Sequence, residues 1–200
     1  MKKALLKYFK ALVKSFAKEP KRLHILHISR VECVDKDGNV KWFEEDIDNL
    51  LHDTGEIALL SAYFATGLTN YGAPVANLYL GLDSRSSLAE ADTLATISGL
   101  EPTTGGYARK ALSTAGTGLS GQDFYINQPA GYYRADSKVV TWTAVGAGYV
   151  AMKNLFLCSD ITAVTDGSDA HLICSVALST TRTLAEGDSL NASIYIGMSE

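Results

Sequence analysis

The chain has 200 residues, of which 46% are hydrophobic and 20% are charged, and its formal net charge at pH 7 is −4. This length suits one β domain with an appendage, and it allows a sizeable core without the help of metal ions or disulfides. The three cysteines, Cys33, Cys158 and Cys174, lie in apolar runs and are odd in number. We therefore expect buried thiols in a reducing compartment and no disulfide framework.

The first 22 residues carry a charge opposite to that of the rest of the chain. They hold eight Lys or Arg and one Glu, a net charge of +7, which leaves the other 178 residues with a net charge of −11. Lysines interrupt every apolar run in this segment, so the sequence predicts neither a secretory signal nor a membrane-spanning helix there. We expect a soluble protein that is not exported by such a signal.

The same segment has the periodicity of an amphipathic helix that stops at Pro20. Its apolar stripe would consist of Leu5, Phe9, Leu12, Val13 and Phe16, and its basic face would include Lys7, Lys10 and Lys14. Such a helix can dock on a protein, lie on a membrane surface or bind nucleic acid. Because the segment lacks Trp and has a single Arg, docking on a protein is favoured. We call residues 1–22 the arm and expect neither a membrane nor a nucleic acid as its partner.

Residues 23–200 are predicted to form one domain in which most elements are strands. Residues 23–44 have the pattern of a hairpin around an Asp-Gly turn, and a capped helix is expected over about residues 53–66. The segment 86–99 is expected to be a connector with a helical turn, in which Ser87 and Glu90 have the spacing of a capping box. The other strand candidates are residues 77–82, 107–115, 123–128, 137–145, 149–159, 171–180 and 189–198.

Two late strand candidates alternate between apolar and polar residues, as strands do when one face of a sheet is buried. The expected buried faces carry Leu172, Cys174, Val176 and Leu178 in one strand, and Leu190, Ala192, Ile194 and Ile196 in the other. Many short strands separated by Gly-rich turns predict a mainly β fold. We expect a jelly-roll-like antiparallel β-sandwich with one short helix and an N-terminal amphipathic helical arm.

No motif in the sequence has the context that catalysis or metal binding requires. Residues 116–121 match G-x-G-x-x-G, but they are followed by strand-forming residues and not by the helix that holds a dinucleotide. Residues 35–38 begin like a calcium loop, yet the Glu that closes such a loop is missing. His52 is expected to form structural hydrogen bonds and not to act as a base. We predict no enzyme activity, no cofactor and no metal site.

The chain is rich in tyrosine, with ten in all. Tyr suits subunit interfaces and sugar-binding surfaces, and half-buried strands favour it equally well. The candidate interface residues are Tyr107, Arg109, Tyr132 and Tyr133.

Residues 49–64, 78–112 and 184–198 together resemble structural proteins of tailed-bacteriophage virions. In that pattern a Tyr-x-Gly-Leu strand leads through Asp-Thr-Leu to Glu-Pro and Gly-Tyr-x-Arg, and a Gly-Asp turn introduces the last strand. The most specific stretch is residues 78–109. The resemblance spans about residues 49–197, excludes the arm, and implies a small β-sandwich building block of the particle with no catalytic residues.

These observations favour a protein of the virion, assembled in the cytoplasm of a bacterial host. The leading interpretation is a capsid decoration or cement protein that stabilises the head lattice. It would be a homo-oligomer, with a trimer favoured, and its partner would be the major capsid protein or another virion protein. The alternative is a tail, collar or head-fibre component that binds the host surface or its glycans through loops 99–106 and 116–131. A glycan hydrolase or lyase ranks last.

Overall fold

The structure is a computed structural model that describes residues 27–48, 50–55, 76–115, 121–127, 134–166 and 170–197. The arm lies outside these residues, as do Tyr132 and Tyr133. Residues 53–55 are helical, and the rest of the helix predicted for residues 53–66 also lies outside the described residues.

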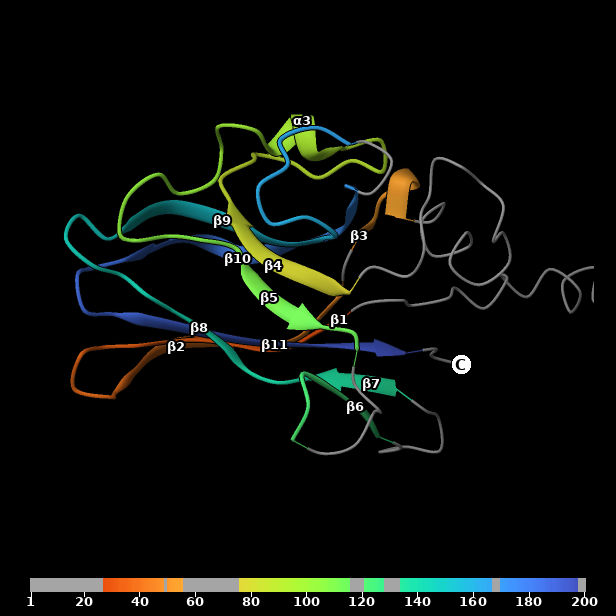
Figure 1. Ribbon diagram of the computed structural model, residues 1–200. Helices are drawn as coiled ribbons and strands as arrows, with labels where there is room; N and C mark the ends of the chain where they lie inside the picture. Colours follow the sequence, from red (N-terminus) through yellow and green to blue (C-terminus); the bar gives the residue numbers. More distant parts are fainter. Residues whose placement is uncertain are drawn as a thin grey trace, which may run out of the picture.

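The described chain is mainly β and forms two antiparallel sheets (Figure 1). One sheet consists of β1 (His27–Val34), β2 (Val40–Asp48), β6 (Phe124–Asn127), β7 (Arg134–Ser137), β8 (Val140–Thr143) and β11 (Ser189–Gly197). The other consists of β3 (Leu50–Leu51), β4 (Asn77–Asp83), β5 (Lys110–Ser113), β9 (Tyr149–Cys158) and β10 (Leu172–Leu184). The strand orders are β2-β1-β11-β7-β6, with β8 also paired to β11, and β3-β10-β9-β4-β5.

The predicted hairpin is confirmed, because β1 and β2 pair in antiparallel register. The Asp35 carboxylate accepts hydrogen bonds from the N–H groups of Asp37 and Asn39, both at 2.9 Å, and Gly38 supplies the left-handed backbone with φ +86°. Every other strand candidate also contains a strand. The sequence did not predict β3, which has two residues, or β7, whose sequence Arg-Ala-Asp-Ser lacks the residues that favour strands.

The helical turn of the connector begins six residues later than Ser87 and Glu90 predicted. It is α3 (Leu94–Ile97), and the N–H of Thr93 donates to Thr96 Oγ1 at 3.1 Å. The chain before it turns instead, because the Asp92 carboxylate accepts the N–H of Ala89 at 2.9 Å. The capping pattern at Ser87 and Glu90 was therefore wrong, since a local turn competes for the same residues.

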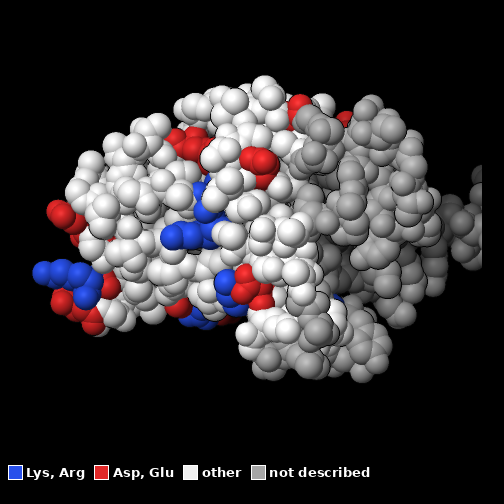
Figure 2. All heavy atoms as spheres, in the orientation of Figure 1, with Lys and Arg blue, Asp and Glu red and all other residues white. Residues whose placement is uncertain are grey.

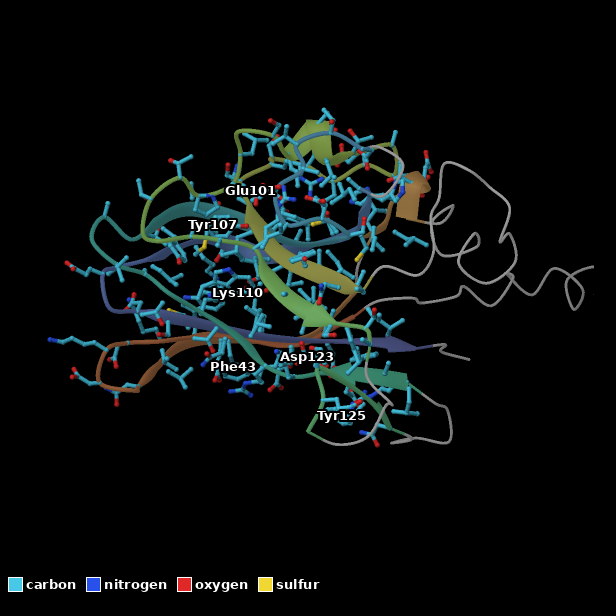
Figure 3. The ribbon with its side chains drawn as sticks, viewed as in Figure 1. Phe43, Glu101, Tyr107, Lys110, Asp123 and Tyr125 are labelled. Atoms are coloured by element: carbon cyan, nitrogen blue, oxygen red, sulfur yellow. The ribbon has the colours of Figure 1, made fainter. Side chains whose placement is uncertain are left out.

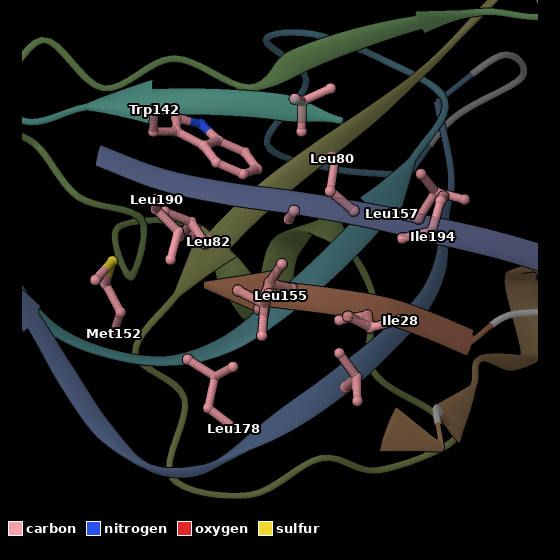
Figure 4. Packing of buried hydrophobic residues seen from close by; sticks show 14 of the residues in the cluster. Ile28, Leu80, Leu82, Trp142, Met152, Leu155, Leu157, Leu178, Leu190 and Ile194 are labelled. Atoms are coloured by element: carbon pink, nitrogen blue, oxygen red, sulfur yellow. The ribbon is translucent and has the colours of Figure 1, made fainter. Parts of the chain in front are cut away.

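Both sheets contribute side chains to one core, which gives a sandwich-like arrangement (Figure 4). Trp142, Leu190 and Ile194 come from the six-stranded sheet and are fully buried. Leu80 and Leu155 come from the five-stranded sheet and are 1% exposed. The indole N–H of Trp142 donates to the carbonyl of Ala108 at 2.9 Å, so its polar atom is satisfied inside the core.

The predicted buried faces are confirmed except at one residue. Leu190, Ala192 and Ile194 of β11 lie in the core with Ile196 packed against it, and β10 adds Cys174, Val176 and Leu178. Leu172 belongs instead to a second cluster, together with Phe156 and Cys158. The register of β10 against β9 shifts between Leu172 and Cys174, so the strict alternation ends there.

Residues 84–106 and 159–166 form a layer that we call the cover. Its Leu94 and Ile97, both on α3, pack with Phe156, Cys158 and Leu172 of the five-stranded sheet. In Figure 1 the cover lies at the top, β4, β9 and β10 lie below it, and the six-stranded sheet lies at the bottom. The cover therefore occupies the outer face of the five-stranded sheet.

Gly81 lets an aromatic ring lie flat on this outer face. It stands opposite Phe156 in the β4–β9 pair, and a Cβ added to Gly81 would come within 2.3 Å of the Phe156 ring. The ring therefore fills the place that any other side chain of residue 81 would take.

We expect Gly81→Ala to lower the free energy of unfolding by about 1–3 kcal/mol, because the methyl group forces the Phe156 ring to move. Urea denaturation measures the change. In a Phe156→Leu background the same substitution should cost less, because leucine leaves more room. An equal cost in both backgrounds would contradict this role of Gly81.

Candidate interaction surface

One guanidinium group joins both segments of the cover. Arg109 precedes β5, and its side chain is only 3% exposed. Its Nε and Nη2 donate to the two oxygens of Glu101 at 3.1 and 2.6 Å. Nη1 and Nη2 also donate to the carbonyls of Asp160 and Ala163, at 2.8 and 3.0 Å. Because one planar group binds both segments, neither can shift without breaking bonds to Arg109.

Tyr107 connects this cluster to the sheet. Its hydroxyl donates to Glu101 Oε2 at 2.8 Å and accepts the N–H of Leu82 at 2.9 Å, and its ring meets the edge of Tyr149. Burial, together with the negative charge of Glu101, raises the pKa of Tyr107 well above its ordinary value. The hydroxyl therefore stays protonated and keeps its donor role. Figure 3 shows Tyr107 and Glu101 close to each other beside β9.

The floor of the cluster is formed by β9. The Arg109 guanidinium lies 5.3 Å from the centre of the Phe156 ring, and its Nη1 lies 3.6 Å from Cys158 Sγ. Burial raises the pKa of the Cys158 thiol to about 11. At neutral pH it is therefore a neutral group and not a reactive thiolate. Like Cys33 and Cys174, it is a buried thiol, as predicted.

A second buried guanidinium fixes the beginning of the cover. Arg85 donates to both oxygens of Asp83, at 3.1 and 2.8 Å, and to Asp92 Oδ2 at 2.9 Å. Asn154 of β9 donates to Asp83 Oδ1 at 2.7 Å. Asp83 is fully buried and Arg85 is 4% exposed, so the pair is shielded from water and oriented by additional hydrogen bonds.

His52 extends this network, and its neighbours define its tautomer. Nδ1 lies 2.9 Å from the carbonyl oxygen of Ala89, which can only accept, so Nδ1 carries the proton. Nε2 then accepts from the hydroxyl of Ser175 at 2.9 Å, and the Ser175 oxygen accepts from Arg85 at 2.6 Å. His52 and Ser175 are 0% and 1% exposed, so the pair has a structural role, as expected for His52.

The structure brings the two described candidate interface residues together. Tyr107 and Arg109 share Glu101 as a partner, and both make contacts inside the chain. Their part in an interface stays a prediction. Tyr132, Tyr133 and the residues of the arm lie outside the described residues. The sequence did not single out Glu101 or Arg85, although each lies in the stretch that carries the resemblance.

The outer surface of the cover combines aliphatic side chains with an excess of acidic groups. Leu100, Ile161 and Val164 are 38, 48 and 54% exposed, and they flank the groups that bind Arg109. Residues 50–55, 83–109 and 159–166 contain seven carboxylates and two guanidinium groups, a net charge of −5, and no Lys. Figure 2 shows acidic atoms and no basic ones over the upper part of the visible face.

The outer face of the six-stranded sheet is different, because its charges are paired. Arg30 binds Glu32 at 2.8 Å and also binds Glu45. Its guanidinium lies 4.7 Å from the ring centre of Phe43, which is 54% exposed. This face therefore offers the exposed ring of Phe43 beside an arginine that is paired with two carboxylates.

The described residues contain no group of three or more His, Cys, Asp or Glu side chains arranged to hold a metal ion. Among the same residues, no helix is long and apolar enough to cross a membrane. Comparison with protein-family models, with curated proteins and with solved structures gives no match to this chain.

The pH dependence of stability tests the buried network. Burial lowers the pKa of His52 in the folded protein. As the pH falls through about 6.5, His52 therefore takes up a proton in the unfolded chain before it does so in the folded protein. The contribution of the neutral His52 to the free energy of unfolding is fully present above that pH, and it is lost as the pH falls toward the lowered pKa. We expect the free energy of unfolding to drop between pH 7 and pH 5, by up to about 1.4 kcal/mol per pH unit from this group.

The variant His52→Gln should be less stable at pH 7 and should show a shallower slope over this range. Urea denaturation at several pH values measures both effects. Equal slopes for the wild type and the variant would show that His52 does not titrate with folding.

Proposed function

We propose that this chain is a structural protein of a tailed-bacteriophage virion. Its role would be that of a capsid decoration or cement protein, which binds the head lattice and stabilises it. The protein would act as a homo-oligomer, with three copies favoured, and its partner would be the major capsid protein or another virion protein.

The proposal rests on the position in the structure of the residues that carry the resemblance. Gly81, Glu101, Tyr107 and Arg109 all come from residues 78–109, and they meet around Phe156 under the cover. The particular residues of this stretch therefore serve to hold the cover in one conformation. A surface that is already ordered loses little conformational entropy on binding. A modest gain per copy, repeated over the equivalent sites of a lattice, would then stabilise the whole shell.

The connections between strands support the jelly-roll-like topology that we propose. The chain crosses from one sheet to the other between β2 and β3, β5 and β6, β8 and β9, and β10 and β11. These crossings favour a jelly-roll-like sandwich. The pairs β1–β2, β4–β5 and β9–β10 each stay within one sheet, so the proposed topology is a variation on the regular pattern.

A second candidate is a tail, collar or head-fibre component that binds the host surface or its glycans. Phe43 favours it, because an exposed aromatic ring held by Arg30 on the outer face of the six-stranded sheet suits stacking against a sugar. In this role residues 99–106 of the cover would belong to the binding face together with residues 116–131.

The two candidates predict different stoichiometries on particles. We expect the purified protein to bind expanded heads, stripped of accessory proteins, saturably and at hundreds of copies per head, on the order expected for a lattice. The same protein without residues 1–22 should bind far fewer. Bound copies are counted by quantitative gel densitometry after sedimentation of the heads.

If neither form bound the heads, or if only a few vertices were occupied, the decoration role would be wrong. Binding to host cells by the wild type, lost in Phe43→Ala, would then favour the fibre role. The variant Val40→Ala changes an exposed residue of the same strand and serves as the control.

A further inference from the structure

We infer that the arm of one copy docks on the cover of a second copy of this chain. The inference does not depend on the virion role, because it concerns contacts between identical chains and is tested on the purified protein alone. It rests on the charge of the cover, on its exposed aliphatic side chains and on the reach of the arm.

Charge is the first argument. The arm carries +7, and the cover with its supporting residues carries −5. Many carboxylates of the cover accept backbone N–H groups, as Asp166 does from Leu94 at 2.7 Å and from Leu172 at 2.9 Å. Such hydrogen bonds to neutral donors orient these acids but leave their negative charge in place. The cover therefore presents a fixed acidic field to a basic partner.

The apolar groups are the second argument. The predicted stripe of the arm contains Leu and Phe at helical spacing, and it needs an apolar surface to cover it. Leu100, Ile161 and Val164 supply exposed aliphatic groups within the acidic field. The outer face of the six-stranded sheet also carries an exposed apolar group, Phe43, but there Glu32 and Glu45 are already paired with Arg30.

The reach of the chain indicates that the partner is a second copy. β1 begins at His27 in the six-stranded sheet, and four residues separate it from the arm. Four intervening residues give five Cα–Cα steps, which span at most about 18 Å. Packed sheets are about 10 Å apart, and the cover adds a further layer above the five-stranded sheet. A connection this short to the six-stranded sheet therefore favours the cover of a neighbour over that of its own chain.

Docking of this kind joins two different surfaces of the same protein. Such a contact gives a dimer by reciprocal exchange or a ring where the rotation between copies closes, and an open filament where it does not. Sedimentation distinguishes a discrete oligomer of the 21.4 kDa chain from an open filament.

The test is sedimentation velocity on five forms of the purified protein. The wild type should sediment as an oligomer, and the chain without residues 1–22 should sediment as a monomer. The cover variant Glu90→Lys/Ala95→Lys changes two exposed positions and raises the net charge by three. We expect it to raise the dissociation constant at least about tenfold, because the charge of the cover with its supporting residues changes from −5 to −2 and its attraction to the basic arm weakens.

The fourth form, Glu45→Lys/Val40→Lys, is the matched control. It makes the same change in charge at exposed positions of β2, on the six-stranded sheet. It should assemble like the wild type. Near-UV circular dichroism of each form verifies that the fold is intact.

A charge change on the arm tests the other side of the contact. A fifth form, Lys7→Glu/Lys10→Glu/Lys14→Glu, lowers the net charge of the arm from +7 to +1, so it should also raise the dissociation constant at least about tenfold. The inference would be overturned by a monomeric wild type, by a truncated chain that still assembles, by equal weakening in the cover and control variants, or by an arm variant that assembles like the wild type.

Discussion

The contact between Arg109 and Glu101 holds the outer layer of this protein in place. Arg109 immediately precedes β5 and Glu101 lies in residues 84–106 of the cover, and the same guanidinium binds two carbonyls of residues 159–166. Removing one partner of a buried ion pair typically costs about 3–5 kcal/mol, because the remaining charge is left without compensation. At this position the loss would also release two loops at once.

This constraint links the interior to the surface. Gly81 lets Phe156 lie flat, Phe156 supports Arg109, and Arg109 fixes the backbone beside Leu100, Ile161 and Val164. A cover made of loops can thus present side chains as reproducibly as a sheet does. The proposed role in a lattice and the inferred contact between copies both depend on that property, since a mobile surface would lose more entropy on binding.

Much of the fold follows from local sequence, and the exceptions have physical causes. The alternation in β11 and the Asp-Gly turn of the hairpin are local features, so the sequence predicts them. β7 was missed because its four residues have no strand pattern, and its pairing with β6 and β11 depends on the rest of the sheet. Leu172 was assigned to the wrong face because a register shift cannot be read from alternation. The candidate site shows the same limit: the sequence indicates Tyr107 and Arg109, but their shared partner Glu101 depends on how residues 84–106 fold back onto the sheet.

The most direct test of the account is hydrogen exchange in Arg109→Lys, which keeps the charge but loses the planar fork. The amide of Ser84 donates to Leu100, and the amide of Ala163 donates to Asp160, so each reports on one segment of the cover. Both amides should lose protection together, by about tenfold or more, while amides between β9 and β10 stay unchanged. Arg30→Lys, at an exposed ion pair, should change neither amide. Loss of protection in one segment only, or in neither, would contradict the claim that Arg109 holds the two segments together.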